Sequence, residues 1–438
     1  MNELVSNNIL AIGYLILWVA TFIWYHLKYQ TLDAGSAIIG MYIIYAIFSI
    51  FAINDELFSM AFNPLKLAPY IYLYGMMMVA LAPITYSHFH PTNAIEDPHT
   101  KIFTILSWFI FVCAILMLPK ILSQQTGGLA SILTDADAGN EAYSEQVDKV
   151  SSSGSSISNL PAVIYNSLSD FPAFLFFYFL SLKEKSKPTM AVLTILLLIS
   201  VYMPVSQGLR GGTVTALLTI TGAYMLFRKY LSKKVNKVIT RIGTASIVII
   251  AVPIMAITIS RFGKEQAGVS GFVNWYVGQG SLYFNNYGLD NGGIRNGDRT
   301  MNFFKRFIDK DTPKNFVERR DKDRFLEIDD NFFSTFVGDF TLDFGPIIPV
   351  FIFLAFNALI IFLIRTKDDK IKVHQLLLIY LTACICLQGG MTLYSYADLG
   401  ALRLVTLGLV YAYLRYHEVL LKRFPIKRPS DEENIQTA

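Results

Sequence analysis

Long apolar segments are the feature that most constrains this chain. A helix needs roughly 20 apolar residues to cross the hydrocarbon core of a membrane, and about eleven stretches of that kind occur along the sequence. With 53% hydrophobic and 16% charged residues, the chain is more apolar than a soluble domain of its length requires. We therefore predict an all-α, polytopic membrane protein. The predicted spans are 8–26, 34–53, 67–86, 101–122, 161–182, 188–206, 211–229, 239–260, 344–364, 373–394 and 400–420.

Basic residues are concentrated in every second connection, and this pattern predicts the orientation. Connections rich in Lys and Arg stay in the cytoplasm, so the N-terminus is expected outside and the C-terminus inside. The formal net charge of +4 follows this pattern and does not indicate a nucleic-acid partner. The N-terminus has no basic residue before its apolar stretch, so we expect the first span to be retained. The basic residues that carry the pattern are Lys183, Lys185, Lys187, Arg228, Lys229, Lys233, Lys234, Lys237, Arg241, Arg365, Lys367, Lys370, Lys372, Arg415, Lys422, Arg423, Lys427 and Arg428.

Two long outward loops divide the chain into three parts. Residues 1–260 are expected to form transmembrane helices 1 to 8, with an outward loop near 123–160 whose Ser and Gly content favours a flexible or peripheral segment. Residues 261–343 contain aromatic patches such as FVNWYVGQGSLYFNNYG, which predict an ordered extracytoplasmic loop subdomain of short helices lying over the membrane. Residues 344–438 are expected to form helices 9 to 11 and a basic cytoplasmic tail.

Arg210 stands inside the otherwise apolar run VSQGLRGGTVTALLTITGAYML. A guanidinium keeps its proton, and at mid-bilayer it costs at least about 3 kcal/mol on insertion scales. Gly211 and Gly212 follow it, so backbone could approach a ligand closely there. An arginine at this position is either an interfacial residue that reaches lipid phosphate or part of an anion site at the mouth of an outward cavity.

Other arginines are predicted on the same outer side. Arg261 lies at the outward end of the eighth span, and Arg403 lies near the outward start of the eleventh. Together with Arg210 they could hold a phosphate or pyrophosphate with the bidentate geometry that lysine lacks. Arg295 and Arg299 in the large loop are further candidates, although charged loop residues are mostly only solvated.

Carboxylates and tyrosines complete the outer group. Asp339 and Asp343 are four residues apart and would share one face of a helix. Either could accept a proton from a sugar hydroxyl, or could instead cap a helix or pair with an arginine. Tyr394 and Tyr396 are expected on the same side, as part of an aromatic belt or stacked on sugar rings.

Several kinds of chemistry receive no support from the sequence. Cys113, Cys384 and Cys386 lie inside apolar runs without metal-ligand spacing, so we predict no disulfide and no metal site. No nucleotide-binding motif is present, and no cofactor is predicted. All histidines map to cytoplasmic loops or helix ends, so an outward reaction would have to use a carboxylate base or rely on leaving-group stabilisation. The histidines are His26, His88, His90, His99, His374 and His417.

The order of four motifs resembles the bacterial oligosaccharide repeat-unit polymerases, the O-antigen polymerase or Wzy-type family. These motifs are GLRGG at 208–212, ISR at 259–261, WYVGQGSLYFNNYG in the large loop, and FSTFVGDFTLDFGPI at 333–347. The resemblance covers the chain from about 160 to 420 in architecture, whereas the first third contributes hydropathy only.

This resemblance implies a GT-C-like, metal-independent glycosyltransferase of the bacterial inner membrane with its active site facing the periplasm or exterior. Its substrates would be undecaprenyl-pyrophosphate-linked glycans. It would be surrounded by membrane lipids, and a chain-length regulator protein is a possible partner. Arg210 and Arg261 would hold the pyrophosphate, and Tyr276 and Tyr283 would lie in the sugar-binding cavity under the loop. A ligase of the same layout is expected to carry a histidine in the large loop, and residues 261–343 contain none. A flippase for lipid-linked glycans remains an alternative, although it would need polar residues in both halves of the membrane.

Overall fold

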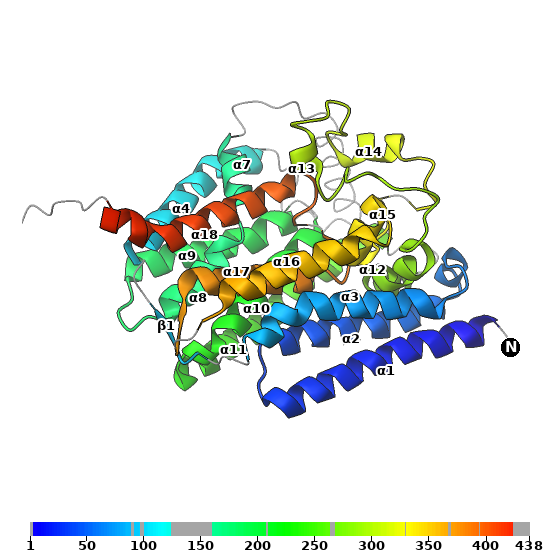
Figure 1. Ribbon diagram of the computed structural model, residues 1–438, viewed down its shortest axis with the longest axis horizontal. Helices are drawn as coiled ribbons and strands as arrows, with labels where there is room; N and C mark the ends of the chain where they lie inside the picture. The colour runs from blue at the N-terminus through cyan, green and yellow to red at the C-terminus, as the bar shows by residue number, and fades with distance from the viewer. Residues whose placement is uncertain are drawn as a thin grey trace, which may run out of the picture.

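Helices dominate the computed structural model, which describes residues 3–88, 92–96, 100–123, 160–206, 209–262, 268–328, 330–366, 369–393 and 395–423. A helix occupies each of the eleven predicted spans, so the prediction of an all-helical chain is confirmed for this part of the sequence. Figure 1 shows these helices as one elongated bundle with most axes running along its length. Their bounds are α1 (Glu3–Tyr29), α2 (Ala34–Ile53), α3 (Leu67–Tyr86), α4 (Thr100–Ser123), α7 (Leu160–Ser167), α8 (Phe171–Ser181), α9 (Lys187–Ser206), α10 (Arg210–Phe227), α11 (Lys233–Phe262), α16 (Ile348–Ile364), α17 (Val373–Gln388) and α18 (Ala401–Arg423).

Six of these helices are long and apolar enough to cross a membrane: α1, α2, α3, α4, α9 and α11. The count rises to seven if α7 and α8, which meet at a bend of 52°, form a single broken span. α16 and α17 are apolar but shorter. The polytopic membrane character is thus supported, whereas the total of eleven spans exceeds what helix length and hydropathy support in the described residues.

Three predicted spans differ in detail from the observed helices. The segment 161–182 is interrupted at 168–170 instead of forming one continuous helix. The ninth span begins at Ile348 and not at 344, because Gly345 adopts a positive φ of 73° and separates α16 from the preceding helix. The tenth span ends at Gln388, and the connection 389–397 that follows is not helical where the structure describes it. Each difference places irregular backbone beside buried polar side chains.

Residues 268–344 form a cap at one end of the bundle. The cap contains α12 (Gly268–Tyr287), α13 (Asn302–Lys305), α14 (Phe316–Lys322) and α15 (Thr335–Phe344). α12 is a 20-residue helix that packs along α2 and also contacts α3, so it is longer than the short helices predicted for this loop. Asn285 fixes one end of α12, because its amide donates to the carbonyl of Lys66 at 2.7 Å and accepts from the Lys66 backbone at 2.8 Å. The cap therefore extends beside the bundle as well as over its end.

Several connections between helices lie at the end of the bundle opposite the cap. The strands β1 (Ala94–Glu96) and β2 (Lys370–Lys372) pair in parallel there and join the chain after α3 to the chain after α16. His88 forms an ion pair with Asp33 at 2.7 Å, and Arg228 donates to the carbonyl of Leu32 at 2.8 Å. Figure 1 shows β1 and the labels of α13 and α14 at opposite sides of the molecule. The basic connection after α10 and the strand β2 thus lie at the end of the bundle away from the cap.

Close packing between α12 and α2 depends on Gly278. A Cβ at this position would lie 2.4 Å from the backbone carbonyl of Phe48, and backbone cannot move aside as a flexible side chain can. We predict that Gly278→Ala lowers the free energy of unfolding by about 1–3 kcal/mol through overpacking. The unfolding temperature of the purified protein in detergent measures this loss.

Gly75→Ala is the matched control, since Gly75 is an exposed helical glycine with nothing within 4 Å of its Cβ position. Its substitution should leave the protein unchanged or stabilise it by up to about 1 kcal/mol, because alanine favours the helix. Equal unfolding temperatures for the two variants would contradict the tight α2–α12 contact.

Candidate functional site

Most of the predicted site residues that the structure describes fall into three groups at the cap end of the bundle. The first is the ion network, formed by Arg295, Arg299 and Arg319 with Asp330, Asp339, Asp343 and Asp398. The second is the Arg210 cluster, formed by Arg210, Thr258 and Tyr276. The third is the Asp170 cluster, formed by Asp170, Tyr396 and Arg403.

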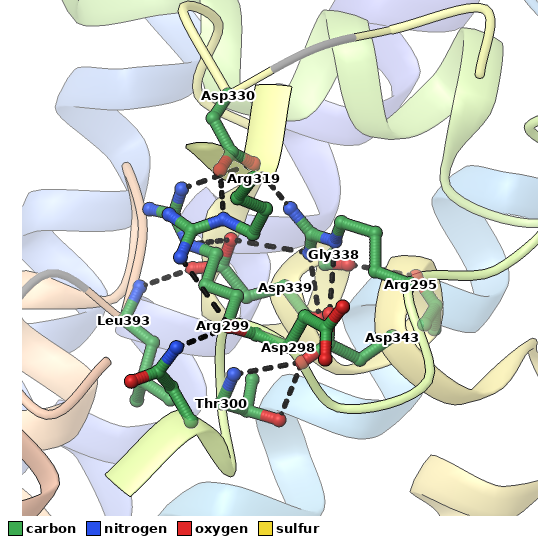
Figure 2. Close-up of polar contacts among 12 residues, drawn as sticks. Arg295, Asp298, Arg299, Thr300, Arg319, Asp330, Gly338, Asp339, Asp343 and Leu393 are labelled. Carbon is green, nitrogen blue, oxygen red and sulfur yellow. Dashed lines mark hydrogen bonds and ion pairs between the residues drawn. The ribbon is translucent and has the colours of Figure 1, made fainter. Parts of the chain in front are cut away.

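Arg295 contacts three aspartates of the ion network (Figure 2). Its Nε is 2.8 Å from Asp343 Oδ1, and one terminal nitrogen is 2.5 Å from Asp330 Oδ1. The other terminal nitrogen donates to the backbone carbonyl of Asp339 at 3.0 Å. The Arg295 side chain is 5% exposed, so this cation is neutralised inside the cap and is not available to a ligand in solution.

Arg299 pairs with Asp339, the other carboxylate predicted on this helix. Its Nε is 2.9 Å from Asp339 Oδ1, and a terminal nitrogen donates to the hydroxyl of Thr392 at 2.6 Å. The other oxygen of Asp339 accepts from that hydroxyl and from the backbone N–H of Leu393, both at 2.6 Å. Asp339 on α15 is therefore bound to the connection that follows α17.

Arg319 extends the network to the start of α18. It contacts Asp330 on one side and Asp398 on the other, and its side chain is 1% exposed. Asp398 begins the short helix η4 (Asp398–Gly400) and has a positive φ of 54°. Arg299 and Arg319 thus join the cap to the chain between α17 and α18, whereas the carboxylates that Arg295 contacts lie within the cap.

Asp339 and Asp343 lie on one helix, α15, as their spacing predicts. Of the roles open to them, pairing with arginine is the one that the structure shows. Asp343 is 0% exposed, and one of its oxygens accepts from the backbone N–H and the hydroxyl of Thr300, each at 2.7 Å. These contacts occupy both carboxylates, which leaves neither in a position to meet a sugar hydroxyl.

Burial and charge act in opposite directions on the network carboxylates. Burial raises the pKa of Asp343 and outweighs the effects of Arg295 and of the Thr300 hydrogen bonds. Burial alone would also raise the pKa of Asp330, but the charges of Arg299, Arg295 and Arg319 outweigh it and hold that pKa well below its ordinary value. Asp330 is consequently a permanent anion at the centre of three cations.

Arg210 is the first residue of α10 and is 8% exposed. One terminal nitrogen donates to the hydroxyl of Thr258 on α11 at 3.2 Å, and the guanidinium lies 5.0 Å from the ring centroid of Tyr276 on α12. Both of these contacts are made to neutral groups. The N-terminus of α10 adds its own partial positive charge at this point.

The two glycines after Arg210 have different roles in packing. A Cβ at Gly212 would lie 2.9 Å from Pro204 Cβ, so this glycine lets α9 and α10 approach each other. A Cβ at Gly211 would lie at an ordinary 3.5 Å from the hydroxyl of Tyr276, so Gly211 faces the aromatic side of the cluster. Arg261 follows Thr258 by three residues on α11, and its side chain lies outside the described part of the chain.

Asp170 is a functional candidate that sequence reasoning did not select. It lies at the bend between α7 and α8, is 6% exposed, and is 3.6 Å from Arg403. The hydroxyl of Tyr396 donates to its carboxylate at 2.9 Å, and the hydroxyl of Tyr380 donates to its backbone carbonyl at 2.7 Å. The signal available in the sequence was a single carboxylate inside an apolar segment, which marks a functional or paired site in membrane proteins.

The remaining predicted tyrosines do not share one location. Tyr283 is 4% exposed and packs against Phe62 and Phe332, with ring centroids 5.0 and 4.7 Å away, so it belongs to the aromatic core of the cap. Tyr394 lies outside the described residues. Among the residues that the structure describes, no group of three His, Cys, Asp or Glu side chains is close enough to hold a metal ion.

The connection 389–397 links the ion network to the Asp170 cluster. The backbone N–H groups of Thr335 and Phe336, at the start of α15, donate to the carbonyls of Met391 and Gly389 at 2.7 and 2.8 Å. Gln388 donates to the hydroxyl of Thr219 on α10 at 2.9 Å. Thr392 and Leu393 bind the ion network, and Tyr396 binds Asp170, so one stretch of chain contacts both groups.

Removing one charge from the ion network should destabilise the fold. Asp330→Asn preserves the side-chain shape but leaves Arg295, Arg299 and Arg319 with one fewer counter-charge, and breaking a buried pair costs about 3–5 kcal/mol. We predict a corresponding fall in unfolding temperature. Asp321→Asn is the control, because Asp321 is 59% exposed in its surface pair with Arg324 and should change stability by less than about 0.5 kcal/mol.

Replacing Asp323 should instead stabilise the fold, by an amount that depends on pH. Burial, followed by the neighbouring charge of Asp298, raises its pKa from 3.8 to about 6, so the native state holds this proton more tightly than the unfolded state. Ionised Asp323 therefore lowers the free energy of unfolding. This loss grows as pH rises from about 4 to about 6 and stays constant at higher pH. Asp323→Asn should therefore raise the unfolding temperature at pH 7.5, with a gain that shrinks progressively between pH 6 and pH 4. The exposed Asp311→Asn variant should show no such trend.

A search against family models, curated proteins and solved structures found no match for this chain. The resemblance to the repeat-unit polymerases therefore rests on the four short motifs at 208–212, 259–261, 275–288 and 333–347. Any functional conclusion must come from the residues at the cap end and their geometry.

Proposed function

We propose that this protein polymerises undecaprenyl-pyrophosphate-linked oligosaccharide repeat units by metal-independent glycosyl transfer. In this proposal all eleven helical segments span the bacterial inner membrane, and the cap end faces the periplasm or exterior. The product is an O-antigen, capsule or exopolysaccharide chain.

The observation that carries the proposal is the position of Arg210. A permanent cation is buried at the N-terminus of α10, beside the hydroxyl of Thr258 and under the ring of Tyr276. Thr258 and Tyr276 are among the groups that position its guanidinium. A helix N-terminus with a buried guanidinium is suited to binding a phosphate or pyrophosphate.

Leaving-group stabilisation supplies the catalysis in this proposal. Breaking the glycosyl phosphate bond develops negative charge on the departing pyrophosphate, and a preorganised cation in a low-dielectric site stabilises that charge by several kcal/mol. Arg261, three residues after Thr258 on α11, acts on the same group. Asp339 and Asp343 serve as positioning residues, because they hold the cap against the connection after α17 and do not touch the substrate.

The test is a reaction of the purified protein with a lipid-linked repeat unit in the absence of nucleotide. A ladder of longer lipid-linked glycans is expected. Arg210→Lys should lower the initial rate by about 10²–10³-fold, the cost of losing one charge-stabilising donor, without lowering the unfolding temperature. Arg324→Lys is the control, since Arg324 is 78% exposed on the cap and should retain full activity.

Two outcomes would overturn the proposal. Transfer of labelled lipid-linked glycan across a vesicle membrane without any ladder would identify a carrier. Full polymerase activity in Arg210→Lys would remove the role assigned to that residue.

A further inference from the structure

The middle of α11 is exposed on the side that faces α10. Thr240 contacts Tyr224 of α10 at 3.0 Å near one end of α11, and Thr258 contacts Arg210 of α10 near the other end. Thr240 and Thr258 are 18 residues apart, which is five turns at 3.6 residues per turn, so both lie on the same face of α11. This face is therefore turned toward α10.

Residues on this face between the two contacts are not covered by α10. The same helical register places Thr244, Ile247 and Ala251 in line with Thr240 and Thr258. All three are exposed, and Ile247 retains 58% of its accessible surface. The two helices thus meet at both ends and do not pack together between them.

The facing side of α10 shows the same pattern. Arg210 and Tyr224 mark the face of α10 that meets α11, and Val214, Leu217 and Thr221 lie between them in register. These three residues are only half-buried. Pro253 lies inside α11 and removes a helical hydrogen bond there.

We propose that the chain of a polyprenyl pyrophosphate lies between α10 and α11, with its pyrophosphate at Arg210. The proposal rests on the function proposed above and identifies where the lipid part of the substrate enters the bundle. Apolar side chains line the middle of this space, and the only charged residue among those named above, Arg210, stands at its cap end. An amphiphile with an anionic head and a long hydrocarbon chain matches that order.

The length of the space suits a long isoprenoid chain. Eighteen residues of α11 rise about 27 Å, which is most of the roughly 30 Å hydrocarbon core of a membrane. Bulk lipid covers the outer face of any membrane helix. In α11, lipid must also cover the face that is turned toward α10. The hydrophobic surface of Ile247 and Leu217 favours that occupancy, and the guanidinium selects chains that carry phosphate.

Two isoleucines of α11 provide a matched test. Ile247 faces α10, whereas Ile249 lies about 200° further around the helix and is 69% exposed on the outer side. Ile247→Trp should fill the space, and Ile249→Trp should only enlarge a lipid-facing side chain. Because both side chains are exposed, both variants should keep the unfolding temperature of the unsubstituted protein.

The experiment measures the binding of undecaprenyl pyrophosphate to the purified full-length protein by native mass spectrometry. We expect Ile247→Trp to weaken binding by about tenfold or more and Ile249→Trp to leave it unchanged. Equal affinities for the two variants would overturn the inference. Loss of binding in competition with equimolar phosphatidylglycerol would also overturn it, because the space would then take ordinary anionic phospholipid.

Failure of the proposed function gives a different result from failure of this inference. If the unsubstituted protein does not bind undecaprenyl pyrophosphate, both fail. If it binds the lipid and Arg210→Lys weakens that binding while Ile247→Trp does not, the pyrophosphate site stands and only the placement of the chain between α10 and α11 is wrong.

Discussion

The arrangement of the cap depends on neutralising three buried arginines. Arg295, Arg299 and Arg319 cannot lose their protons, so their burial requires carboxylates at short distance. Those carboxylates come from three separate places: Asp330 in the cap loop, Asp339 and Asp343 on α15, and Asp398 before α18. Since each partner left alone would be strongly destabilising, the network fixes the cap and the α17–α18 connection relative to one another.

Fixing the cap also positions the aromatic side of the Arg210 cluster. The start of α15 is bound to the chain after α17, and Phe333 just before it donates its backbone N–H to Gln279 of α12 at 3.2 Å. Tyr276, one turn earlier on α12, lies over Arg210 and packs against Phe333 with ring centroids 5.2 Å apart. The ion network thus helps to position Tyr276 over Arg210, through the contacts of Phe333 with Gln279 and Tyr276.

The α10–α11 pair shows how packing and chemistry combine. Arg210 joins the two helices at the cap end, and Tyr224 joins them at the other end. Between these contacts, apolar residues such as Ile247 remain exposed on the inward side. A cation at the end of an uncovered apolar space is the arrangement that a phosphate-bearing lipid requires, and it links the proposed chemistry to entry from the membrane.

The spacing of apolar residues was sufficient to predict most helices. The segments 34–53 and 67–86 coincide with α2 and α3, because an uninterrupted apolar run of membrane length has one stable backbone solution. The segment 161–182 was predicted as continuous since hydropathy averages over a window, and one buried Asp170 at a bend hardly changes the average. The helix α12 was predicted only as part of a subdomain of short helices, because its amphipathic pattern is weak and its position depends on the glycine contact with α2 at Gly278.

The amino-acid sequence by itself determined the membrane class, the helical segments and the presence of arginines and carboxylates on one side. Only the tertiary structure decided which of these charges pair with each other. Asp339 and Asp343 were candidates for a base until Arg295 and Arg299, some 40 residues away in the chain, were seen to occupy them. Hydropathy and local spacing are properties of neighbours in sequence, whereas charge pairing depends on distances in space, and those are set by how the whole chain packs.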